Sequence, residues 1–379
     1  MYTQNQIVLS LGSNEGEKLA VLKKAISLIN KTIGTVVNIS PVYEFPAWGF
    51  ESSPFYNCAI LIHTALPAEK VIQKILESER ELGRVRTEQS GYAARIIDID
   101  IISFNQEIYN TPQLTVPHPL MQDRLFVLRP ATDLELDWKH PIFKKSFKEL
   151  LSACSDKTTY KKVAEIDAPI LKYSFSKFNF IAIEGNIGAG KTTLVNRIAF
   201  DFNAKTILEG FADNPFLPKF YKDANRYAFP LEMSFLADRY LQLSDDLAQL
   251  DLFKEFVIAD YYVFKSLIFA QITLERDEFN LYKQIFEIMY KDTPKPDLYI
   301  YLHQSTNRLL QNIQKRGRTY EMEISDTYLE KVNKGYFNYI KTLPQSSVLI
   351  IDISDLDFVS NQQDYISLLN QIQKKIETT

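Results

Sequence analysis

The stretch GNIGAGKT at residues 185–192 constrains the fold of this chain more than any other feature of its sequence. It fits the pattern G-x-x-x-x-G-K-[ST], and it stands between an apolar run at 178–185 and a segment with helical spacing. In such a loop, backbone N–H groups turn toward a phosphate, and the N-terminus of the next helix adds partial positive charge. The pattern therefore predicts a strand, a phosphate-binding loop and a helix, which together form a nucleotide site.

The long stretch that precedes this strand indicates a second domain. A chain of 379 residues is more than one hydrophobic core usually holds. The sequence between Cys154 and Lys177 is polar, with neither a sustained period nor a core face. We therefore expect domains at 1–158 and 177–379, joined by a linker at 159–176.

The two halves have different hydrophobic patterns. After the loop, apolar strands at 256–262 and 297–303 alternate with long helical segments, which predicts an α/β domain with a parallel sheet flanked by helices. In the first half the expected order is β, α, β, β, α, β, which favours an α+β sandwich of the ferredoxin-like kind. The elements expected there are strands at 6–11, 35–45, 55–64 and 95–104 and helices at 16–32 and 67–83.

The composition disfavours several classes of protein. The formal net charge of −4, with Lys and Arg spread along the chain, provides no basic stripe for a nucleic acid. Cys58 and Cys154 are too few for a disulfide framework or a zinc site. No apolar run approaches the roughly 20 residues that span a bilayer, and the N-terminus lacks a signal-peptide pattern. We expect a cytoplasmic protein with no nucleic-acid or membrane partner.

The phosphate-binding loop sets the expected contacts with ATP. Lys191 is expected to contact the β- and γ-phosphates, and Thr192 to bind Mg²⁺ through its hydroxyl group. The residues expected to bind ATP are Gly185, Asn186, Ile187, Gly188, Ala189, Gly190, Lys191, Thr192 and Thr193.

The residues after the loop indicate the acceptor of the phosphate. Residues 178–372 resemble the deoxynucleoside kinase family, in particular through the loop, Glu209, NPFLPKFYKD at 214–223 and KRGRTYE at 315–321. The resemblance implies that Glu209 is the general base, which accepts the proton of the deoxyribose 5′-hydroxyl as it attacks the γ-phosphorus. It also implies a homodimer through this domain.

The same resemblance assigns residues around the sugar and the phosphates. It implies that Tyr221 and Glu321 hold the 3′-hydroxyl. It implies further that Arg316 and Arg318 neutralise charge on the transferring phosphoryl group. Asp260, at the end of a predicted strand, is expected at Mg²⁺ or its water, the alternative being a cap of the strand end.

The position that reads the base departs from the family pattern. Glu232 stands where the family commonly has Gln, and an ionised carboxylate accepts hydrogen bonds but donates none. A base that carries an amine is therefore favoured over thymine. The likeness of this half to bacterial purine deoxynucleoside kinases favours deoxyadenosine, while guanine offers Glu232 two adjacent donors and deoxycytidine also stays open.

Two further departures concern the cations of the site. The family's acidic-Arg-Ser triplet corresponds to DYY at 260–262, so the arginine is absent and Arg239 is expected to help orient Glu209. Asn312 and Gln314 occupy two positions that are often arginine in the family. The expected positive charge over the phosphates is therefore lower than is usual for the family.

In the first half, two aspartates interrupt an aliphatic strand, RIIDIDII at 95–102. Asp98 and Asp100 alternate with isoleucines, so their side chains share one face of the strand. Two adjacent carboxylates are costly to bury unless a cation compensates them, and Mg²⁺ bound together with substrate phosphates is the natural ion. The alternative is an exposed polar face on an edge strand.

Arginines near this pair indicate polyphosphate chemistry, and here a second resemblance is specific. Residues 7–151 resemble the hydroxymethyl-dihydropterin pyrophosphokinase family through LGSN, SPVYEFPAWG, FYNCAI, ELGRVR, RIIDIDII and VPHPLMQDRLFVLRP. The resemblance implies that Asp98 and Asp100 hold two Mg²⁺ on ATP. It implies that the β,γ-diphosphoryl group then passes to the pterin hydroxymethyl oxygen.

The resemblance also assigns the contacts of the pterin and of ATP. Phe55 and Phe126 would sandwich the pterin ring, while Asn57 and backbone groups near Phe45 would read its edge. The arginines and the histidine around ATP are expected to act in catalysis. The residues assigned to this ATP site are Glu79, Arg84, Arg95, Thr115, His118 and Arg124.

The sequence thus predicts a bifunctional enzyme in which each half uses Mg²⁺ and takes ATP as co-substrate. A second hypothesis keeps the first half catalytic and makes the second a nucleotide sensor without turnover, because the triplet arginine is absent. A nucleic-acid-dependent ATPase is disfavoured by the acidic balance.

Overall fold

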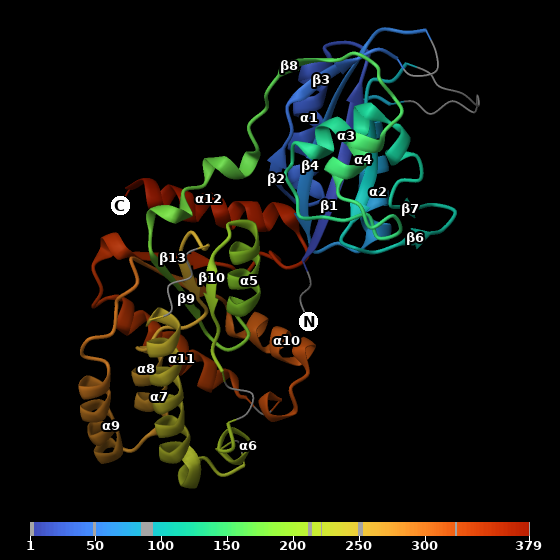
Figure 1. Cartoon of the computed structure of the whole chain (residues 1–379). Helices are drawn as coiled ribbons and strands as arrows, with labels where there is room; N and C mark the ends of the chain where they lie inside the picture. Colours follow the sequence, from blue (N-terminus) through green and yellow to red (C-terminus); the bar gives the residue numbers. More distant parts are fainter. Residues whose placement is uncertain are drawn as a thin grey trace. The chain divides into compact units, whose positions relative to one another are not determined.

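The computed structural model describes residues 4–47, 51–84, 94–210, 214–220, 222–248, 253–322 and 324–378. The chain forms two compact units, each with its own sheet (Figure 1). The first unit comprises Met1–Tyr173 and Phe358–Ile366, and the second comprises Ser174–Asp357 and Ser367–Thr379. Residues 358–366 therefore belong with the first unit, although the predicted boundaries put them in the second.

The sheet of the second unit is parallel, with the order β10-β11-β9-β12-β13. Its strands are β9 (Phe180–Gly185), β10 (Lys205–Ile207), β11 (Val257–Ala259), β12 (Leu298–His303) and β13 (Val348–Asp352). The central strand β9 ends at the phosphate loop, which places the loop at the carboxyl edge of the sheet, where α/β folds bind ligands. Strands β10 and β13 were not predicted, because β10 is very short and β13, at the sheet edge, has no regular alternation of buried and exposed residues.

Helices cover both faces of this sheet, which confirms the predicted α/β class (Figure 1). Ala182 and Tyr301 belong to a core shared with α7, α8, α9 and α11. The alternate residues Ile181 and Ile183 point to the opposite face, where α5 packs on β9, β10 and β11. The helices are α5 (Lys191–Asp201), α6 (Leu217–Phe220), α7 (Ala224–Ala248), α8 (Lys265–Thr273), α9 (Arg276–Met289), α10 (Thr306–Arg316), α11 (Asp326–Ile340) and α12 (Gln362–Thr378).

The sheet of the first unit is antiparallel, with the order β5-β1-β4-β3-β8 and β2 also paired with β4. The two predicted strands at 55–64 and 95–104 correspond to β4 and β5. The single strand predicted at 35–45 is divided into β2 and β3, and Ser40 between them donates its backbone N–H to Ala59. The strands are β1 (Asn5–Ser13), β2 (Thr35–Ile39), β3 (Val42–Phe45), β4 (Phe55–Thr64), β5 (Asp98–Phe104) and β8 (Lys161–Ala164), and a small separate sheet contains β6 (Tyr109–Asn110) and β7 (Thr115–Val116).

Helices pack on both faces of this sheet as well. Ile7, Leu9 and Ile60 face α1 (Lys18–Thr32) and α2 (Ala68–Glu81), which are the two helices that the sequence predicts. Val8 and Ala59, on the other face, pack on α3 (Leu125–Thr132) and α4 (Phe147–Ala153), which the predicted sandwich did not include. The alternation along β1 and β4 explains why both faces are apolar.

The linker predicted at 159–176 is wrong in part. Residues Lys161–Ala164 form β8, which pairs with β3 and is the edge strand of the sheet, and Lys161 makes an ion pair with Glu44 at 2.9 Å. Residues Pro169–Lys172 and Phe175–Lys177 form short 3-10 helices. An edge strand is held by backbone hydrogen bonds, so a polar sequence without a core face does not reveal it.

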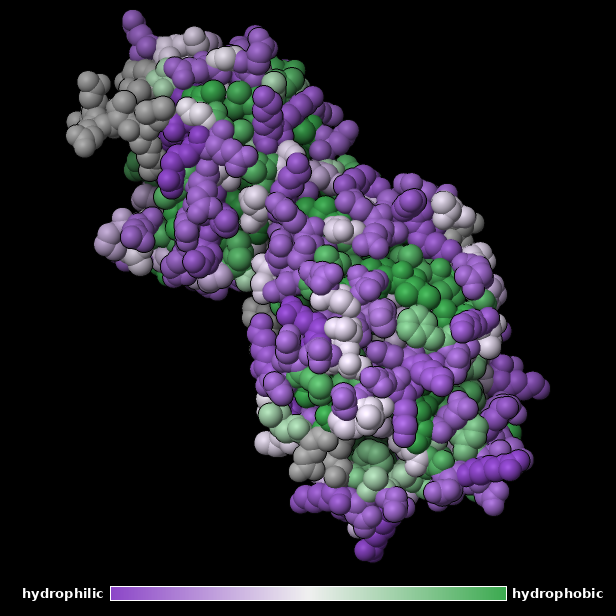
Figure 2. Space-filling model, turned by 180° about the vertical axis from the view of Figure 1, so that it is seen from behind, coloured by the Kyte–Doolittle hydropathy of each residue, from purple (hydrophilic) through white to green (hydrophobic). Residues whose placement is uncertain are grey.

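The surface is mixed in polarity. On the face that Figure 2 shows, hydrophilic side chains cover most of each unit, and apolar side chains gather in smaller areas. Within the described ranges, no helix is both long and apolar enough to cross a membrane.

Candidate active sites

The phosphate loop of the second unit depends on its glycines. Gly188 and Gly190 have φ values of 83° and 79°, in the left-handed region that glycine adopts without strain. A Cβ atom on Gly185 would lie 2.8 Å from the carbonyl oxygen of Leu302 on β12. The loop is therefore packed closely on the sheet and turns directly into α5, which begins at Lys191.

Side chains fix the shape of this loop. Asn186 donates from Nδ2 to the carbonyl oxygen of Leu329 and to Oδ1 of Asn333, both at 2.8 Å, and its Oδ1 accepts the N–H of Ile187 at 2.8 Å. Lys191 Nζ donates to the carbonyl oxygens of Gly185 and Asn186 at 2.9 and 3.0 Å. Burial, and then the positive charge of Lys265, lower the pKa of Lys191 to about 8. The ammonium group thus lies over the loop, in a place where a phosphate would stabilise its charge.

A chain of contacts connects the loop to the neighbouring strands. Thr192, in the first turn of α5, donates its hydroxyl to Oδ2 of Asp260, which follows β11. Oδ1 of Asp260 accepts the backbone N–H of Glu209 at 2.8 Å. A hydroxyl beside a carboxylate, next to a phosphate loop, is a donor set that suits Mg²⁺.

Glu209 lies between two cations. Its Oε1 accepts hydrogen bonds from Arg239 Nε at 3.0 Å and Nη2 at 2.6 Å, and its Oε2 accepts one from Lys265 Nζ at 2.5 Å. Burial alone would raise the pKa of Glu209, but the charges of Lys265 and Arg239 hold it well below the usual range of a glutamate. The structure thus places Arg239, expected from the sequence, on Glu209.

Lys265 was not among the predicted residues. It is a single lysine within the apolar sequence YYVFKSLIFA, and it begins α8 soon after Asp260. A buried lysine in such a segment is unusual enough to be a signal, but its partner cannot be read from the sequence.

Glu232, on α7, lies in the same pocket but apart from Glu209. Its Oε1 accepts a hydrogen bond from the hydroxyl of Thr273 at 3.1 Å. Its Oε2 is buried and has no hydrogen-bond partner in the described part of the chain. Burial raises the pKa of Glu232 to about 7. An orphaned, buried carboxylate oxygen of this kind is ready to accept a donor from a ligand.

The predicted lid arginines meet at one carboxylate. Arg316 at the end of α10 and Arg318 after it both donate to Glu321, the latter at 3.2 Å. Asn312, on the same helix, donates to the carbonyl oxygen of Gly188 at 2.9 Å and so supports the phosphate loop. Tyr221 lies outside the described residues.

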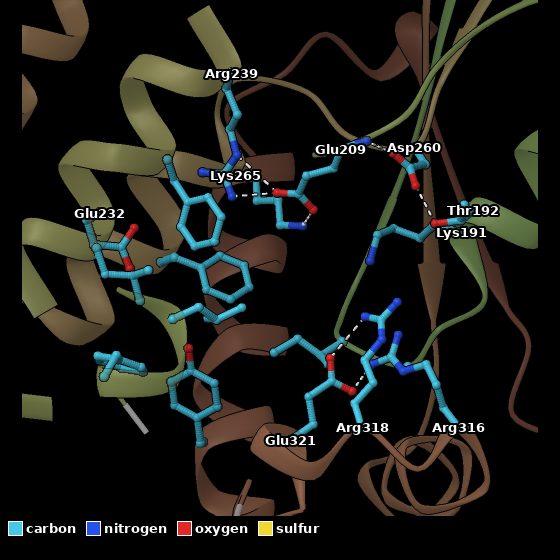
Figure 3. A pocket seen from close by; sticks show the side chains of 18 residues that line it. Lys191, Thr192, Glu209, Glu232, Arg239, Asp260, Lys265, Arg316, Arg318 and Glu321 are labelled. Atoms are coloured by element: carbon cyan, nitrogen blue, oxygen red, sulfur yellow. Dashed lines mark hydrogen bonds and ion pairs between the residues drawn. The ribbon is translucent and has the colours of Figure 1, made fainter. Parts of the chain in front are cut away.

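These groups line one pocket of about 880 Å³, a volume that includes its open mouth. Figure 3 shows the side chains of Glu209, Arg239 and Lys265 converging, with Lys191 and Thr192 on one side. Glu232 lies on the far side, beyond the aromatic rings that line the middle of the pocket. The pocket thus has a phosphate end and an apolar end that closes on a carboxylate.

In the first unit, the candidate site crosses three adjacent strands. Gly12 on β1 is paired with Asn57 on β4 and with Asp98 on β5. A Cβ atom on Gly12 would lie 2.8 Å from Nδ2 of Asn57, so the glycine leaves space beside this amide. Asn57 is buried, and its Oδ1 has no hydrogen-bond partner among the residues that the structure describes.

The predicted acidic pair lies on the same face of β5. Asp98 accepts from Arg84 at 2.5 Å and also from Arg95. Burial, and then the charge of Asp98, raise the pKa of Asp100 to about 7. A divalent cation would relieve this repulsion, so the pair fits Mg²⁺. In the described ranges, no group of three or more Asp, Glu, His or Cys side chains is arranged to hold a metal, so the protein would supply only this pair of carboxylates.

Glu79 on α2 connects the arginines to the strand. Its Oε1 accepts the backbone N–H of Ile99 at 3.0 Å and also accepts from Arg84. The structure therefore brings four of the predicted residues together, namely Glu79, Arg84, Arg95 and Asp98.

The remaining predicted residues lie on the segment after β5. His118 donates its backbone N–H to Ile102 on β5, and burial followed by the charge of Arg124 lowers its pKa to about 4. The guanidinium of Arg124 lies 5.6 Å from the ring centroid of Phe126. Thr115 is exposed on β7, in the small separate sheet.

The aromatic residues predicted to hold the pterin surround β3. Phe45 is buried and meets Phe126 edge to face, with the ring centroids 6.4 Å apart. Phe55 lies opposite Phe45 in the register of β3 and β4. Tyr160, which was not among the predicted residues, stacks on Phe45 with the ring centroids 5.0 Å apart and precedes β8.

Asn14 was also missed, although it belongs to the LGSN motif. Its Oδ1 accepts the backbone N–H of Arg95 at 2.7 Å. Its Nδ2 donates to the hydroxyl of Ser52 at 3.0 Å and to the carbonyl oxygen of Ser53 at 3.2 Å. One buried amide thereby holds two segments that flank the candidate site.

Comparisons with known proteins divide the chain in the same way. The model of the family described as "Deoxynucleoside kinase" matches residues 181–377, and that of "7,8-dihydro-6-hydroxymethylpterin-pyrophosphokinase (HPPK)" matches residues 8–136. The deoxyguanosine kinase of Bacillus subtilis is 41% identical over 201 residues, which cover 52% of this chain and 97% of that protein. The deoxyadenosine kinase of Lactobacillus acidophilus is 31% identical over 52% of this chain and 95% of its own. The 2-amino-4-hydroxy-6-hydroxymethyldihydropteridine pyrophosphokinase of Aquifex aeolicus is 37% identical over 38% of this chain and 88% of its own.

Proposed function

Because the chain belongs to the deoxynucleoside kinase family through residues 181–377 and to the hydroxymethylpterin pyrophosphokinase family through residues 8–136, we propose that it is a bifunctional ATP-dependent transferase. The first unit transfers diphosphate from ATP to the hydroxymethyl oxygen of 6-hydroxymethyl-7,8-dihydropterin, a step of folate biosynthesis. The second transfers the γ-phosphate of ATP to the 5′-hydroxyl of a purine deoxynucleoside, a salvage reaction.

The contact of Glu209 with the phosphate loop, through Asp260 and Thr192, carries the proposal for the second unit. Glu209 accepts the proton of the 5′-hydroxyl while the 5′-oxygen forms its bond to the γ-phosphorus and the bond from that phosphorus to ADP breaks. Thr192 and Asp260 would hold Mg²⁺ directly or through water, and the ion neutralises phosphate charge. Lys191 and the backbone of the loop orient the phosphates.

Glu232 carries the proposal for the base. An ionised carboxylate accepts two hydrogen bonds, and guanine offers N1–H and the N2 amine side by side, whereas adenine offers its N6 amine next to an acceptor nitrogen. The sequence favours deoxyadenosine, but the carboxylate chemistry and the more similar relative, a deoxyguanosine kinase, favour deoxyguanosine as the preferred substrate. Deoxyadenosine is the second candidate.

The test of base choice is a set of initial rates with Mg-ATP and each of the four deoxynucleosides. We expect kcat/KM to be highest for deoxyguanosine. Replacing Glu232 by Gln, which presents one acceptor and one donor, should lower this preference. A wild-type preference for deoxycytidine or thymidine would contradict the proposal.

For the first unit, the unpartnered Oδ1 of Asn57 supports a polar heterocycle at this place. The edge of a pterin has donors that would satisfy it, and the neighbouring aromatic residues provide a stacking surface. Asp98 and Asp100 would hold Mg²⁺ on ATP, and the arginines would bind the phosphate oxygens. The test is formation of AMP and pterin diphosphate, with activity expected only when both ATP and the pterin are present.

A second hypothesis has one observation in its favour. Two cations hold the pKa of Glu209 low, and a low pKa makes the carboxylate a weaker base. A sensor that binds deoxynucleosides without turnover would not need a strong base at this position. Lys191, Thr192 and Glu209 are all present, however, and this supports catalysis. Binding of a deoxynucleoside without any product would favour the sensor.

The proposal also covers the fold class of the first unit, the oligomeric state and the location in the cell. The antiparallel order β5-β1-β4-β3 with α1 and α2 on one face supports a ferredoxin-like class for the first unit. Leu281 and Ile288, 50% and 77% exposed on α9, support a homodimer formed through the second unit, which light scattering would test. We propose a cytoplasmic location because the sequence shows neither a long apolar run nor a signal-peptide pattern.

A further inference from the structure

Three charged side chains meet in the pocket of the second unit. Glu209 faces both Arg239 and Lys265, and the three side chains are only 10%, 5% and 8% exposed. One carboxylate thus forms ion pairs with two cations in a space with little access to water. The buried carboxyls of Glu184 and Glu232 also lie in the field of Lys265. What Lys265 can offer a phosphate therefore depends on its free N–H donors and not on a surplus of positive charge.

The two cations differ in how fully they are bound. Arg239 gives two donors to Oε1 of Glu209 and a third to the hydroxyl of Ser266 at 2.7 Å, and its guanidinium lies 4.8 Å from the ring centroid of Phe235. Lys265 has three N–H donors, and its described hydrogen bond is the one to Oε2 of Glu209. Arg239 is therefore fixed in place, while Lys265 keeps donors for a ligand in the pocket that it lines.

The charge of Lys265 reaches the phosphate loop. This charge is the second cause, after burial, of the lowered pKa of Lys191 in the phosphate loop. Figure 3 shows Lys265 beside the Glu209 carboxylate and Lys191 beside Thr192 at the phosphate loop. Arg316 and Arg318, by contrast, are both bonded to Glu321. The ammonium group of Lys265 can therefore reach a phosphoryl group that arrives between Glu209 and the loop.

We propose that Lys265 is a catalytic residue of phosphoryl transfer, whose ammonium group moves from Glu209 to an oxygen of the transferring phosphoryl group when the 5′-hydroxyl binds to Glu209. The proposal rests on the kinase function proposed above. The 5′-oxygen bonds to the γ-phosphorus, the bond to the ADP oxygen breaks, and the hydroxyl proton passes to Glu209. The departure of Lys265 from Oε2 frees that oxygen to accept the hydroxyl proton.

The test compares Lys265→Met, Lys265→Arg and the wild type. Methionine keeps the length of the side chain but removes its charge, and Lys283→Met on the exposed face of α9 is the matched control. We expect K265M to lower kcat by about 100- to 1000-fold, as the loss of a transition-state donor does, with KM for the deoxynucleoside changed by less than about threefold. K265R should recover kcat to within about tenfold of the wild type, because it restores the charge. K283M should match the wild type.

Ligand binding separates a contact with phosphate from a structural role. By calorimetry, K265M should bind the deoxynucleoside as the wild type does, but its affinity for the 5′-monophosphate product should fall by about tenfold or more. Equal loss of affinity for both ligands would overturn the proposal in favour of a packing role. The pyrophosphokinase activity of the same molecules measures the amount of active protein. If K265M does not fold, Lys265→Gln, which keeps a donor to Glu209 without the charge, replaces it.

Two failures are distinguishable. A folded K265M with the kcat of the wild type overturns the role of Lys265 alone. A wild type that phosphorylates no deoxynucleoside overturns the kinase function, and the catalytic role of Lys265 with it.

Discussion

The two units are built to hold the phosphates of ATP with different parts of the chain. In the second unit one contiguous loop, residues 185–192, presents backbone groups at the end of a parallel strand. In the first unit the phosphate-binding candidates are side chains from α2, β5 and the segment before it, on one face of an antiparallel sheet. A backbone site needs a local motif, whereas a side-chain site needs several distant segments to meet.

The electrostatics of the two sites are opposite. Burial, and then the charge of a second carboxylate, Asp98, raise the pKa of Asp100 to about 7, so this site favours a metal cation. Glu209 lies in the field of two cations, and its pKa is held low, so this site favours a phosphate anion. The same reagent, Mg-ATP, can therefore be bound in one unit mainly through its metal and in the other mainly through its phosphates.

Replacing Asp98 by Ala should have the largest effect on activity. If this change did not lower pterin pyrophosphorylation, the contrast between a metal-binding site in the first unit and a phosphate-binding loop in the second would be wrong. The change removes a metal-binding carboxylate and leaves Arg84 and Arg95 without their shared partner. Pterin pyrophosphorylation should fall by about 1000-fold or more, a loss of roughly 4 kcal/mol in transition-state stabilisation, while deoxynucleoside phosphorylation stays at the wild-type rate. Steady-state assays of both products on one sample measure this. Loss of both activities in a folded variant would show that the sites are not independent.

Replacing Asn14 by Asp sharpens the account of the first unit. Aspartate keeps the acceptor for the N–H of Arg95 but removes the donors to Ser52 and Ser53. We expect a loss of about tenfold in kcat/KM for the pterin, because one segment beside the pocket is no longer held, with a smaller change in KM for ATP. The kinase activity of the second unit is the internal control. A larger effect on ATP than on the pterin would contradict this division.

The pH dependence of base choice tests the role of Glu232. The pKa of this buried carboxyl is about 7, so it is neutral below that pH and ionised above it. Guanine needs the ionised form as acceptor, so kcat/KM for deoxyguanosine should fall by about tenfold per pH unit below 7. Adenine can pair with the neutral acid, which both accepts and donates, so its kcat/KM should fall less.

The measurement is the ratio of kcat/KM for the two purine deoxynucleosides between pH 6 and 8, in the wild type and in Glu232→Gln. The ratio should rise with pH in the wild type and stay constant in the variant. A constant ratio in the wild type would remove Glu232 from the base pocket.

Replacing Thr273 by Val should have the smallest effect. Valine keeps the shape but removes the hydroxyl that donates to Glu232. The free energy of unfolding should fall by about 1 kcal/mol in urea denaturation. The hydrogen bond from Thr273 lowers the pKa of Glu232, because it stabilises the ionised carboxylate. Its loss should therefore raise this pKa and move the midpoint of the pH-dependent base choice to higher pH. A midpoint that moved to lower pH would contradict this reading.

The contrast between the units also explains what the sequence could predict. The loop at 185–192 and the parallel sheet follow from local patterns, and the structure brings Glu209, Asp260 and Arg239 to the same pocket. Lys265 could not be predicted, because its contact with Glu209 depends on how α8 starts after β11. Asn14 was missed for a similar reason, since its partners lie in distant segments.

Elements held mainly by backbone pairing were the other omissions. β8 has the short sequence KKVA and is the edge strand beside β3, and its side chains do not show the alternation of a half-buried strand. β10 contributes only KTI to the second sheet. Hydrophobic periodicity detects elements through the core that they bury, and these strands bury little.

The central claim is that the second unit is a kinase in which Glu209 takes the proton, alongside an independent pyrophosphokinase. The most direct test is an assay of both products with Mg-ATP, the pterin and each of the four deoxynucleosides, for the wild type and Glu209→Gln side by side. The account predicts that deoxyguanosine monophosphate forms fastest in the wild type and disappears in the variant, while pterin diphosphate forms equally in both. Phosphorylation at the wild-type rate in Glu209→Gln, or no phosphorylation of any deoxynucleoside by the wild type, would contradict it.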